Sequence, residues 1–372
     1  MERYRRGESI AAICVSLKRS RSWFYKWLSR ADHEERAWYE EQSRRRHDTG
    51  RCAEDLRAGI IQTRGRLEAA GTFVSAQMIA WELEDQQIEP PSISTIKRIL
   101  KAAGLTVPKR RMPKGTKYPA PLAVEPGAVH QVDFVGPRYA GGKRFYSLNG
   151  VDVATGRAAA EPVSSRATEH VIPGLWNVWT RMGIPSILQL DNELVFFGNR
   201  RYPSAAGQVM RLCFAAGVEL VFIPIREPWR NGVVEKFNDH WNRMFYRRIQ
   251  MSSFDIVRSE SLQFEGRHNS TWRYQKIGGC TPNDALAQSA VELRFPSRPT
   301  PPPMPFEKPT EGRVSFIRFI RSDLSLEIFG QRFPMPTEAT HEYVRATIDV
   351  AAQTMTVVLH KEVIQRHAYS LG

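Results

Sequence analysis

The sequence predicts a multidomain protein: α-helical helix-turn-helix units first, an α/β core in the middle and a small β-barrel last. Apolar residues recur at helical spacing up to about residue 106, and short strand-like runs begin near residue 128. A chain of 372 residues is long enough for two or three domains of roughly 150 residues each. The predicted boundaries are 1–50 and 51–106 for two helix-turn-helix units, 107–127 for a basic linker, 128–295 for the core, 296–312 for a proline-rich spacer and 313–372 for the barrel.

The composition is that of a globular protein, with 42% hydrophobic and 25% charged residues. No run approaches the roughly 18 apolar residues of a membrane span, so no membrane partner is expected. The N-terminus has no apolar stretch typical of a secretory signal, and the 4 cysteines stand too far apart to form a zinc clip. These features predict a cytoplasmic protein with reduced thiols.

The charge balance is the most informative part of the composition. The chain carries 53 Lys and Arg against 39 Asp and Glu, for a net charge of +14 and a pI near 9.8. Most of the surplus lies in the first third of the chain. A surplus of this size attracts polyanions, so double-stranded DNA is the expected partner and association with the nucleoid the expected location. The alternative is a solvated basic surface without a partner.

The first helical unit has the layout of a helix-turn-helix. Ser9 is placed to cap a short helix, a polar break follows at 18–20, and a second helix starts near Ser20 to Ser22. In this layout the second helix enters the major groove of DNA, although a plain helical hairpin has the same periodicity. The candidate DNA-binding residues here are Arg19, Arg21, Tyr25 and Lys26.

The pattern recurs at 92–104, after helices predicted at about 53–70 and 74–83. Ser94 is the expected N-cap of the last helix and Gly104 ends it. The exposed face carries Lys97, Arg98 and Lys101, and these are the candidate DNA-binding residues of the second unit. The linker that follows contains Lys109, Arg110 and Arg111 among 5 prolines, and it is expected to follow a phosphate backbone.

The central third alternates strands and helices. Strands are predicted at 129–135, 145–153, 157–163, 186–190 and 218–223, and helices at 167–182, at about 204–216 and from 231 onwards. Three antiparallel strands followed by helix, strand, helix, strand and helix form a mixed sheet in the order of the ribonuclease-H-like fold.

Three carboxylates stand where such a sheet brings them together. Asp133 lies within an apolar strand, Asp191 ends a buried strand, and Glu235 lies in the first turn of a helix. Oxygen ligands without Cys or His suit Mg²⁺, or Mn²⁺ in its place. Two such ions per site, about 3.5–4 Å apart, can support in-line phosphoryl displacement. Each carboxylate taken alone fits a structural cap or a surface group equally well.

Four sequence blocks make the chain resemble a known family: 130–133, 190–192, 228–238 and 278–285. The first three resemble the catalytic blocks of the retroviral-integrase-like DDE transposases encoded by bacterial insertion sequences, and 278–285 resembles the Gly-x-Thr-Pro-x-x-Ala stretch that closes that family's core. The resemblance covers roughly residues 125–290. By this resemblance Asp133, Asp191 and Glu235 are the catalytic metal-binding triad. Arg230, Asn231 and Lys236 join the candidate DNA-binding residues, with Asn231 shaping the helix entrance.

The sequence departs from the family pattern at two places. Glu193 follows the second block where a small residue is usual, which adds a charge near the expected metals. The interval from Asp191 to Glu235 is also long, and the surplus is expected at 197–206. Asp152 matches an acidic residue common in the family and is expected to be structural. Trp229, Trp241 and Trp272 are expected to pack in the interior and not to stack on bases.

The last third predicts five short strands, at 313–320, 324–328, 331–333, 343–349 and 354–360, which suggest a small barrel. By analogy such a barrel binds DNA or a neighbouring protomer; the alternative is that it only packs against the core.

The expected function is therefore a DNA transposase that binds the terminal inverted repeats of its element, cleaves their 3′ ends and joins them to target DNA. It is expected to act as a homo-oligomer, at least a dimer. The alternatives are a catalytically idle DNA-binding regulator derived from a transposase and a structure-specific nuclease.

Overall fold

The computed structural model describes residues 1–33, 54–72, 74–106, 118–121, 123, 125–198 and 205–372. The chain divides into two compact units, Met1–Leu56 and Arg57–Gly372, and each is described by itself. The candidate linker residues Lys109, Arg110 and Arg111, and much of the predicted insertion at 197–206, lie outside the described residues.

In residues 1–33, the first unit forms the short helices α1 (Glu2–Arg5), α2 (Ile10–Ser16) and α3 (Arg21–His33). Ser9 caps α2 as predicted, because its side chain accepts a hydrogen bond from the backbone N–H of Ala12 at 3.2 Å. A small cluster of Ile13, Cys14 and Phe24 packs α2 against α3. The basic side chains of α3 therefore lie on its outer face.

The boundary between the units falls in the first turn of α4 (Glu54–Ala69), which is followed in the second unit by α5 (Ala76–Asp85) and α6 (Ile93–Ala102). The prediction of Ser94 as the N-cap of α6 is wrong by two residues. Ser92 has an extended backbone after two prolines, and its side chain accepts from the N–H of Thr95 at 3.3 Å. Ser94 lies inside the helix instead, while Ile96, Ile99 and Leu100 form the buried stripe as predicted.

The core is a mixed sheet in the predicted order. An antiparallel meander of β1, β2 and β3 comes first, and β4 and β5 then add parallel to β1, giving the order β3-β2-β1-β4-β5. This mixed α/β arrangement is consistent with a ribonuclease-H-like core. The bounds are β1 (Val129–Ala140), β2 (Lys143–Asp152), β3 (Ala158–Val163), α7 (Thr168–Met182), β4 (Ile187–Leu190), α8 (Leu194–Phe197), α9 (Gln208–Ala215) and β5 (Glu219–Phe222).

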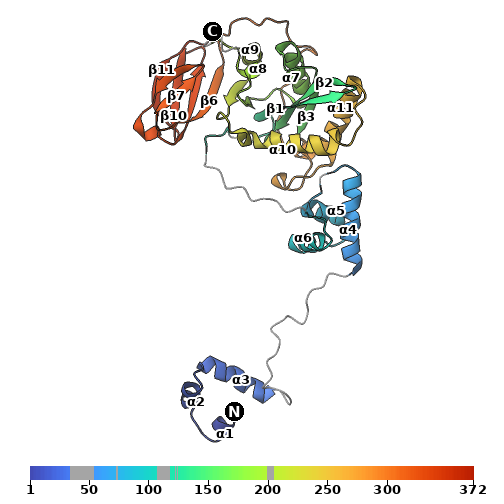
Figure 1. Ribbon diagram of the computed structural model, residues 1–372, viewed down its shortest axis with the longest axis vertical. Coiled ribbons are helices and arrows are strands. Elements are labelled where there is room, and N and C mark those ends of the chain that lie inside the picture. Colours follow the sequence, from blue (N-terminus) through green and yellow to red (C-terminus); the bar gives the residue numbers. More distant parts are fainter. Residues whose placement is uncertain (34–53, 73, 107–117, 122, 124, 199–204) are drawn as a thin grey trace. The chain divides into compact units, whose positions relative to one another are not determined.

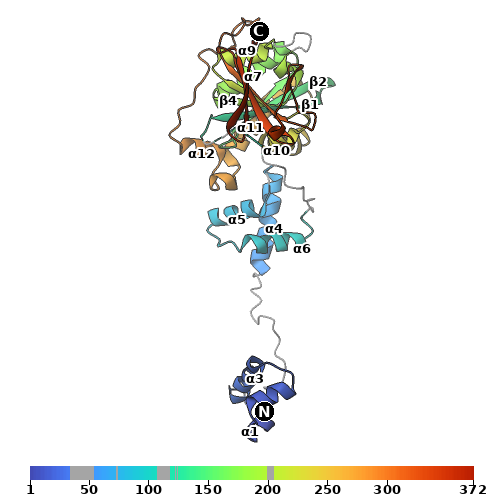
Figure 2. The ribbon, with the colours of Figure 1, turned by 90° about the vertical axis from the view of Figure 1, so that its left-hand side faces the viewer.

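Helices cover both faces of this sheet (Figures 1 and 2). Helices α7 and α9 pack on the face that presents Val132, Leu148 and Leu190. The opposite face, with Val135 and Val151, packs against α10 and α11. Alternate residues of one strand thus enter two separate apolar clusters. The remaining helical elements are η1 (Pro228–Asn231), α10 (Gly232–His240), η2 (Trp241–Tyr246, a π-helix), α11 (Phe254–Thr271), η3 (Gln275–Ile277) and α12 (Pro282–Ala287).

The C-terminal strands do not form the separate barrel that was predicted. Within the described residues β6 pairs in parallel with β5, so one sheet of 9 strands runs in the order β11-β10-β9-β6-β5-β4-β1-β2-β3. Strands β7 and β8 form a hairpin of their own. Alternating hydrophobicity identifies strands but not their partners, and here the last strands extend the core. Their bounds are β6 (Arg313–Phe319), β7 (Ser325–Ile328), β8 (Gln331–Pro334), η4 (Thr337–Ala339), β9 (Tyr343–Asp349), β10 (Thr354–Leu359) and β11 (Glu362–Ala368).

Candidate active site

The three predicted carboxylates come from β1, the end of β4 and the start of α10. Gln131 of β1 is level with Gln189 of β4, and continuing this register by two residues brings Asp133 level with Asp191. Glu235 lies in the first turn of α10, a helix that packs on β1. The fold thus directs the three segments to one place.

The electrostatics of Asp133 show that these groups share one environment. Burial, the largest cause, and the negative charges of Asp191, Glu193 and Glu235 together raise the pKa of Asp133 to about 7. Burial also raises the pKa of Asp191 and of Glu235. A divalent cation would relieve this accumulation of negative charge, and an oxygen-only donor set suits Mg²⁺.

As the side chains stand in the described part of the chain, no three His, Cys, Asp or Glu residues are grouped closely enough to hold a metal ion. The carboxylate oxygens are therefore suitable ligands for Mg²⁺, but the three side chains must move closer together to coordinate it.

A chain of amides, from half-buried Asn238 to fully buried Asn149, holds Asp133. Asn238 Nδ2 donates to Asp133 Oδ2 at 2.8 Å, and Asn149 Nδ2 donates to Asn238 Oδ1 at 2.8 Å. Ser147 Oγ completes the chain by donating to Asn149 Oδ1 at 2.6 Å. Sequence reasoning assigned no role to these residues. One signal was present, because Asn238 lies three residues after Glu235 and so shares its face of the helix.

A second set of amides joins β1, β4 and the start of α10. Gln131 Oε1 accepts from the backbone N–H groups of Val233 at 3.0 Å and Val234 at 3.2 Å, and so caps the helix. Asn231 Nδ2 donates to the carbonyl of Val132 at 3.2 Å, and Gln189 Nε2 donates to Asn231 Oδ1 at 3.2 Å. Asn231 is only 2% exposed, so it shapes the helix entrance as expected but does not lie on a DNA-facing surface.

Arg230, a predicted DNA-binding residue, is turned into the protein. Its guanidinium pairs with Glu227 at 2.9 Å and lies over the rings of Tyr118 and Tyr343, at 4.4 and 5.0 Å from their centroids. The side chain is 10% exposed. DNA contact through this guanidinium is therefore not what the structure favours.

Glu193 lies beside the site, as its sequence position predicted. Its backbone N–H donates to Asp191 Oδ1 at 3.1 Å, and its carboxylate pairs with Arg166 at 2.8 Å. The positive charge of Arg166 opposes the burial that raises the pKa of Asp191. Arg166 was not singled out from the sequence, because it lies far from the four sequence blocks.

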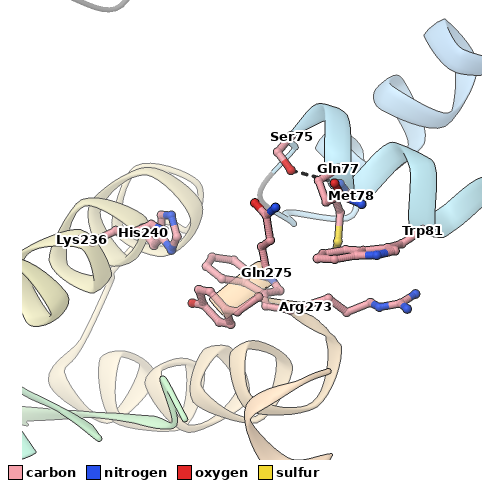
Figure 3. Close-up of a pocket in the computed structure, with 10 residues that line it drawn as sticks. Ser75, Gln77, Met78, Trp81, Lys236, His240, Arg273 and Gln275 are labelled. Carbon is pink, nitrogen blue, oxygen red and sulfur yellow. Dashed lines mark hydrogen bonds between the residues drawn. The ribbon is translucent and has the colours of Figure 1, made fainter. Parts of the chain in front are cut away.

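Lys236 lies on another side of α10 from the carboxylates. Its ammonium is 5.5 Å from the ring centroid of Tyr274, and together with His240 it lines a cavity of about 190 Å³. Figure 3 shows this cavity, with Trp81 of α5 beside the side chain of Arg273. The guanidinium of Arg273 also pairs with Asp85 at 2.9 Å. Asp152 is the last residue of β2, and Thr155 Oγ1 in the following turn donates to it at 2.7 Å, consistent with the structural role expected for it.

The predicted basic surfaces are present on the helical units. Arg21, Tyr25 and Lys26 are exposed on α3, with Arg19 just before it, and Lys97, Arg98 and Lys101 are exposed on α6.

Trp241 and Trp272 are buried as predicted. The prediction for Trp229 is wrong, since this side chain is 58% exposed. The short 3-10 turn η1 leaves Trp229 outside while its neighbour Arg230 points in.

Asp133 also makes stability depend on pH. Its pKa in the metal-free folded state, about 7, lies above the ordinary 3.8, so the stability it contributes is complete below pH 4 and lost as the pH rises through 7. Asp133→Asn is expected to remove this decline in the free energy of unfolding, which is on the order of a few kcal/mol. Urea unfolding in EDTA at pH 5 and pH 8 measures it. Asp239→Asn, at an exposed residue paired with Arg243, should keep the wild-type decline; equal declines in wild type and Asp133→Asn would contradict the prediction.

In the described residues, no helix combines the length and apolar character needed to cross a membrane.

No protein-family model and no curated protein matches the chain. Among solved structures, the HTLV-2 integrase catalytic core domain in complex with magnesium (trimeric form) is 13% identical with a TM-score of 0.36, covering 44% of this chain and 99% of that one. The dimeric form is 12% identical with a TM-score of 0.35, at the same coverage of 44% and 99%. The simian T-cell lymphotropic virus intasome in complex with PP2A regulatory subunit B56 gamma is 14% identical with a TM-score of 0.40, covering 83% of this chain and 97% of that one. TM-scores this low carry no argument about the fold, which is therefore described from the strand order of this chain alone.

Proposed function

We propose that the chain is a DNA transposase of the DDE type, which binds the terminal inverted repeats of its element, cleaves their 3′ ends and joins them to target DNA. What supports the proposal most is the position of Asp133, Asp191 and Glu235 on three adjacent elements, β1, the end of β4 and the start of α10, which buried amides tie together. The basic faces of α3 and α6 supply a second, independent reason to expect DNA.

In this proposal Asp133, Asp191 and Glu235 hold two Mg²⁺ ions, for which Mn²⁺ can substitute. When bound, such ions activate a water or a 3′-hydroxyl and stabilise the leaving oxygen of the phosphodiester. Asn238 holds Asp133 in a fixed orientation through its 2.8 Å hydrogen bond. Gln131 fixes the first turn of α10, and thereby Glu235, against β1. Preorganisation of this kind reduces the reorganisation needed at the moment of reaction.

The experiment that tests the proposal uses oligonucleotides from the inverted repeats flanking the gene. Purified protein is incubated with the end-labelled repeats and a target plasmid in Mg²⁺ or Mn²⁺. Site-specific 3′ cleavage followed by joining supports the proposal. Repeat binding without any cleavage would indicate the catalytically idle regulator, and cleavage that depends on DNA shape and not on the repeat would indicate a nuclease.

Oligomer formation gives a further prediction. One triad completes one joining at a time, while insertion of an element requires two, so we expect at least a dimer that holds both ends. A chain with Asp133→Asn and a chain with Lys97, Arg98 and Lys101 changed to Ala should each be inactive alone and recover cleavage when mixed. The matched control mixes Asp133→Asn with Asp191→Asn, which should stay inactive because every site lacks one ligand. Inactive mixtures under conditions where the two chains demonstrably associate would contradict catalysis in trans.

A further inference from the structure

Two side chains of the C-terminal strands reach the segments that carry Asp191 and Glu235. Arg318 of β6 contacts Asn192, the residue directly after Asp191. Tyr343 of β9 contacts Arg230, which lies in the turn that leads into α10. Neither residue was singled out from the sequence, which predicted for this region the binding of DNA or of a neighbouring protomer, or packing alone.

Arg318 is held in a closed set of hydrogen bonds. Its Nη2 donates to Asn192 Oδ1 at 2.8 Å, and its Nη1 donates to the carbonyl of Ile223 at 3.1 Å. Asn192 Nδ2 donates to that same carbonyl at 2.7 Å, which closes the ring. Arg318 is 7% exposed, and a buried guanidinium is costly unless its donors are satisfied. Both terminal nitrogens donate, since Nη1 also reaches the carbonyl of Ile317 at 2.9 Å, while Nε has no hydrogen-bond partner among the described residues. The strand end carrying Asp191 is therefore fixed to β6 by a charged, directional contact.

Tyr343 acts on the other catalytic segment through Arg230. Its hydroxyl accepts from Arg230 Nη2 at 3.1 Å and donates to Glu227 Oε1 at 2.7 Å. The backbone carbonyl of Arg230 accepts from Gln189 Nε2 at 3.1 Å, which links the turn to β4. The hydroxyl thus completes a cluster that sets where α10, and with it Glu235, begins.

Other contacts already join the C-terminal strands to the core. These are the β5–β6 pairing and the stacked rings of Phe222 and Phe316, with centroids 5.2 Å apart. A buried ion pair or charged contact adds little net stability compared with apolar packing. Such a contact does fix the orientation of the segments that it joins. Both contacts fall within a few residues of a proposed catalytic carboxylate.

From these contacts we propose that the C-terminal strands are a positioning element of the active site, in which Arg318 orients the Asp191 segment and Tyr343 orients the start of the Glu235 helix. The inference rests on the proposed function. Both are positioning residues and touch neither substrate nor reacting atoms. Loss of either contact should lower the rate of the chemical step and weaken metal binding while leaving DNA affinity unchanged.

The test compares two conservative variants with a matched control. Tyr343→Phe keeps the ring over Arg230 and removes only the hydroxyl, and Arg318→Lys keeps the charge but cannot span both acceptors. We expect single-turnover cleavage at saturating DNA to slow by roughly 10- to 100-fold, the range that a small misplacement of reacting groups produces. The DNA dissociation constant should stay within about twofold of wild type, because a positioning residue acts through kcat and not through KM.

The control is Arg345→Gln, which lies two residues after Tyr343 and so on the same face of β9. Arg345 joins β9 to Glu219 at 2.6 Å, at the opposite end of β5 from Ile223, so its loss removes a comparable contact away from the site. It should lower the melting temperature as much as the other variants without changing the cleavage rate.

A second readout, Mn²⁺ affinity by titration calorimetry without DNA, separates this inference from the proposed function. Weaker Mn²⁺ binding in Tyr343→Phe and Arg318→Lys, and not in Arg345→Gln, supports the positioning role even if wild type proves inactive on the repeats. Wild-type rate and Mn²⁺ affinity in Tyr343→Phe would overturn it. Equal losses of cleavage rate and Mn²⁺ affinity in Arg345→Gln would overturn it too, because the effect would then follow from lower stability of the whole protein. If Arg318→Lys fails to fold, Tyr343→Phe alone decides.

Discussion

Asp191→Asn is expected to abolish strand cleavage and joining while leaving DNA binding within about twofold of wild type. The amide keeps the shape of the side chain, and its oxygen can still accept from the N–H of Glu193 as Asp191 does at 3.1 Å. It loses the negative charge that a metal ligand requires. Losing several kcal/mol of transition-state stabilisation corresponds to a rate loss on the order of 1,000-fold or more.

The measurement is cleavage of labelled terminal repeats in Mg²⁺, with binding followed by gel shift on the same DNA. The control is Asp239→Asn, which makes the same chemical change on α10 at a side chain paired with Arg243 and 57% exposed. It should cleave at the wild-type rate. Normal strand transfer by Asp191→Asn would remove Asp191 from the site.

The second large effect is expected at α6. Changing Lys97, Arg98 and Lys101 together to Ala should weaken binding of the terminal repeats on the order of 100-fold at moderate salt, since three contacts at roughly 1 kcal/mol each are lost. The slope of log affinity against log salt concentration should become shallower by about one unit per lost phosphate contact. Helix α6 should still fold, because its buried stripe of Ile96, Ile99 and Leu100 is unchanged.

The matched control removes three charges from the same helical unit at α4, where Arg57 is exposed, Arg64 pairs with Glu68 and Arg66 pairs with Glu82. This triple variant should retain most of the affinity and the wild-type salt slope. Equal losses in both triple variants would show that α6 contributes net charge only and has no specific DNA-facing role.

Much of the core could be predicted from the sequence, because strands and N-caps can be recognised from residues that are close together in the chain. Alternating hydrophobicity located the five core strands, and a charge in an apolar run marked Asp133. The positions of Asp191 at a strand end and Glu235 in a first helical turn followed from the same pattern. Ser9 was recognised as an N-cap for a similarly local reason.

The features that could not be predicted depend on contacts between distant segments. Gln131 and Gln189 look like ordinary strand residues, and their roles appear only when β1, β4 and α10 meet. Arg230 was a DNA-binding candidate because of the block it belongs to, and that block does not reveal that Glu227 and Tyr343 hold its guanidinium inside the protein. The barrel was predicted as a separate domain because nothing in the sequence of β6 indicates its parallel partner β5.

The central claim is that Asp133, Asp191 and Glu235 hold the metal ions that support DNA cleavage. Anomalous diffraction from crystals of the full chain grown with Mn²⁺ tests it most directly. We predict anomalous density coordinated by oxygens of all three carboxylates, and its loss in Asp191→Asn crystals under the same conditions. Density at another site, with none among these carboxylates at a Mn²⁺ concentration that supports cleavage, would contradict the account.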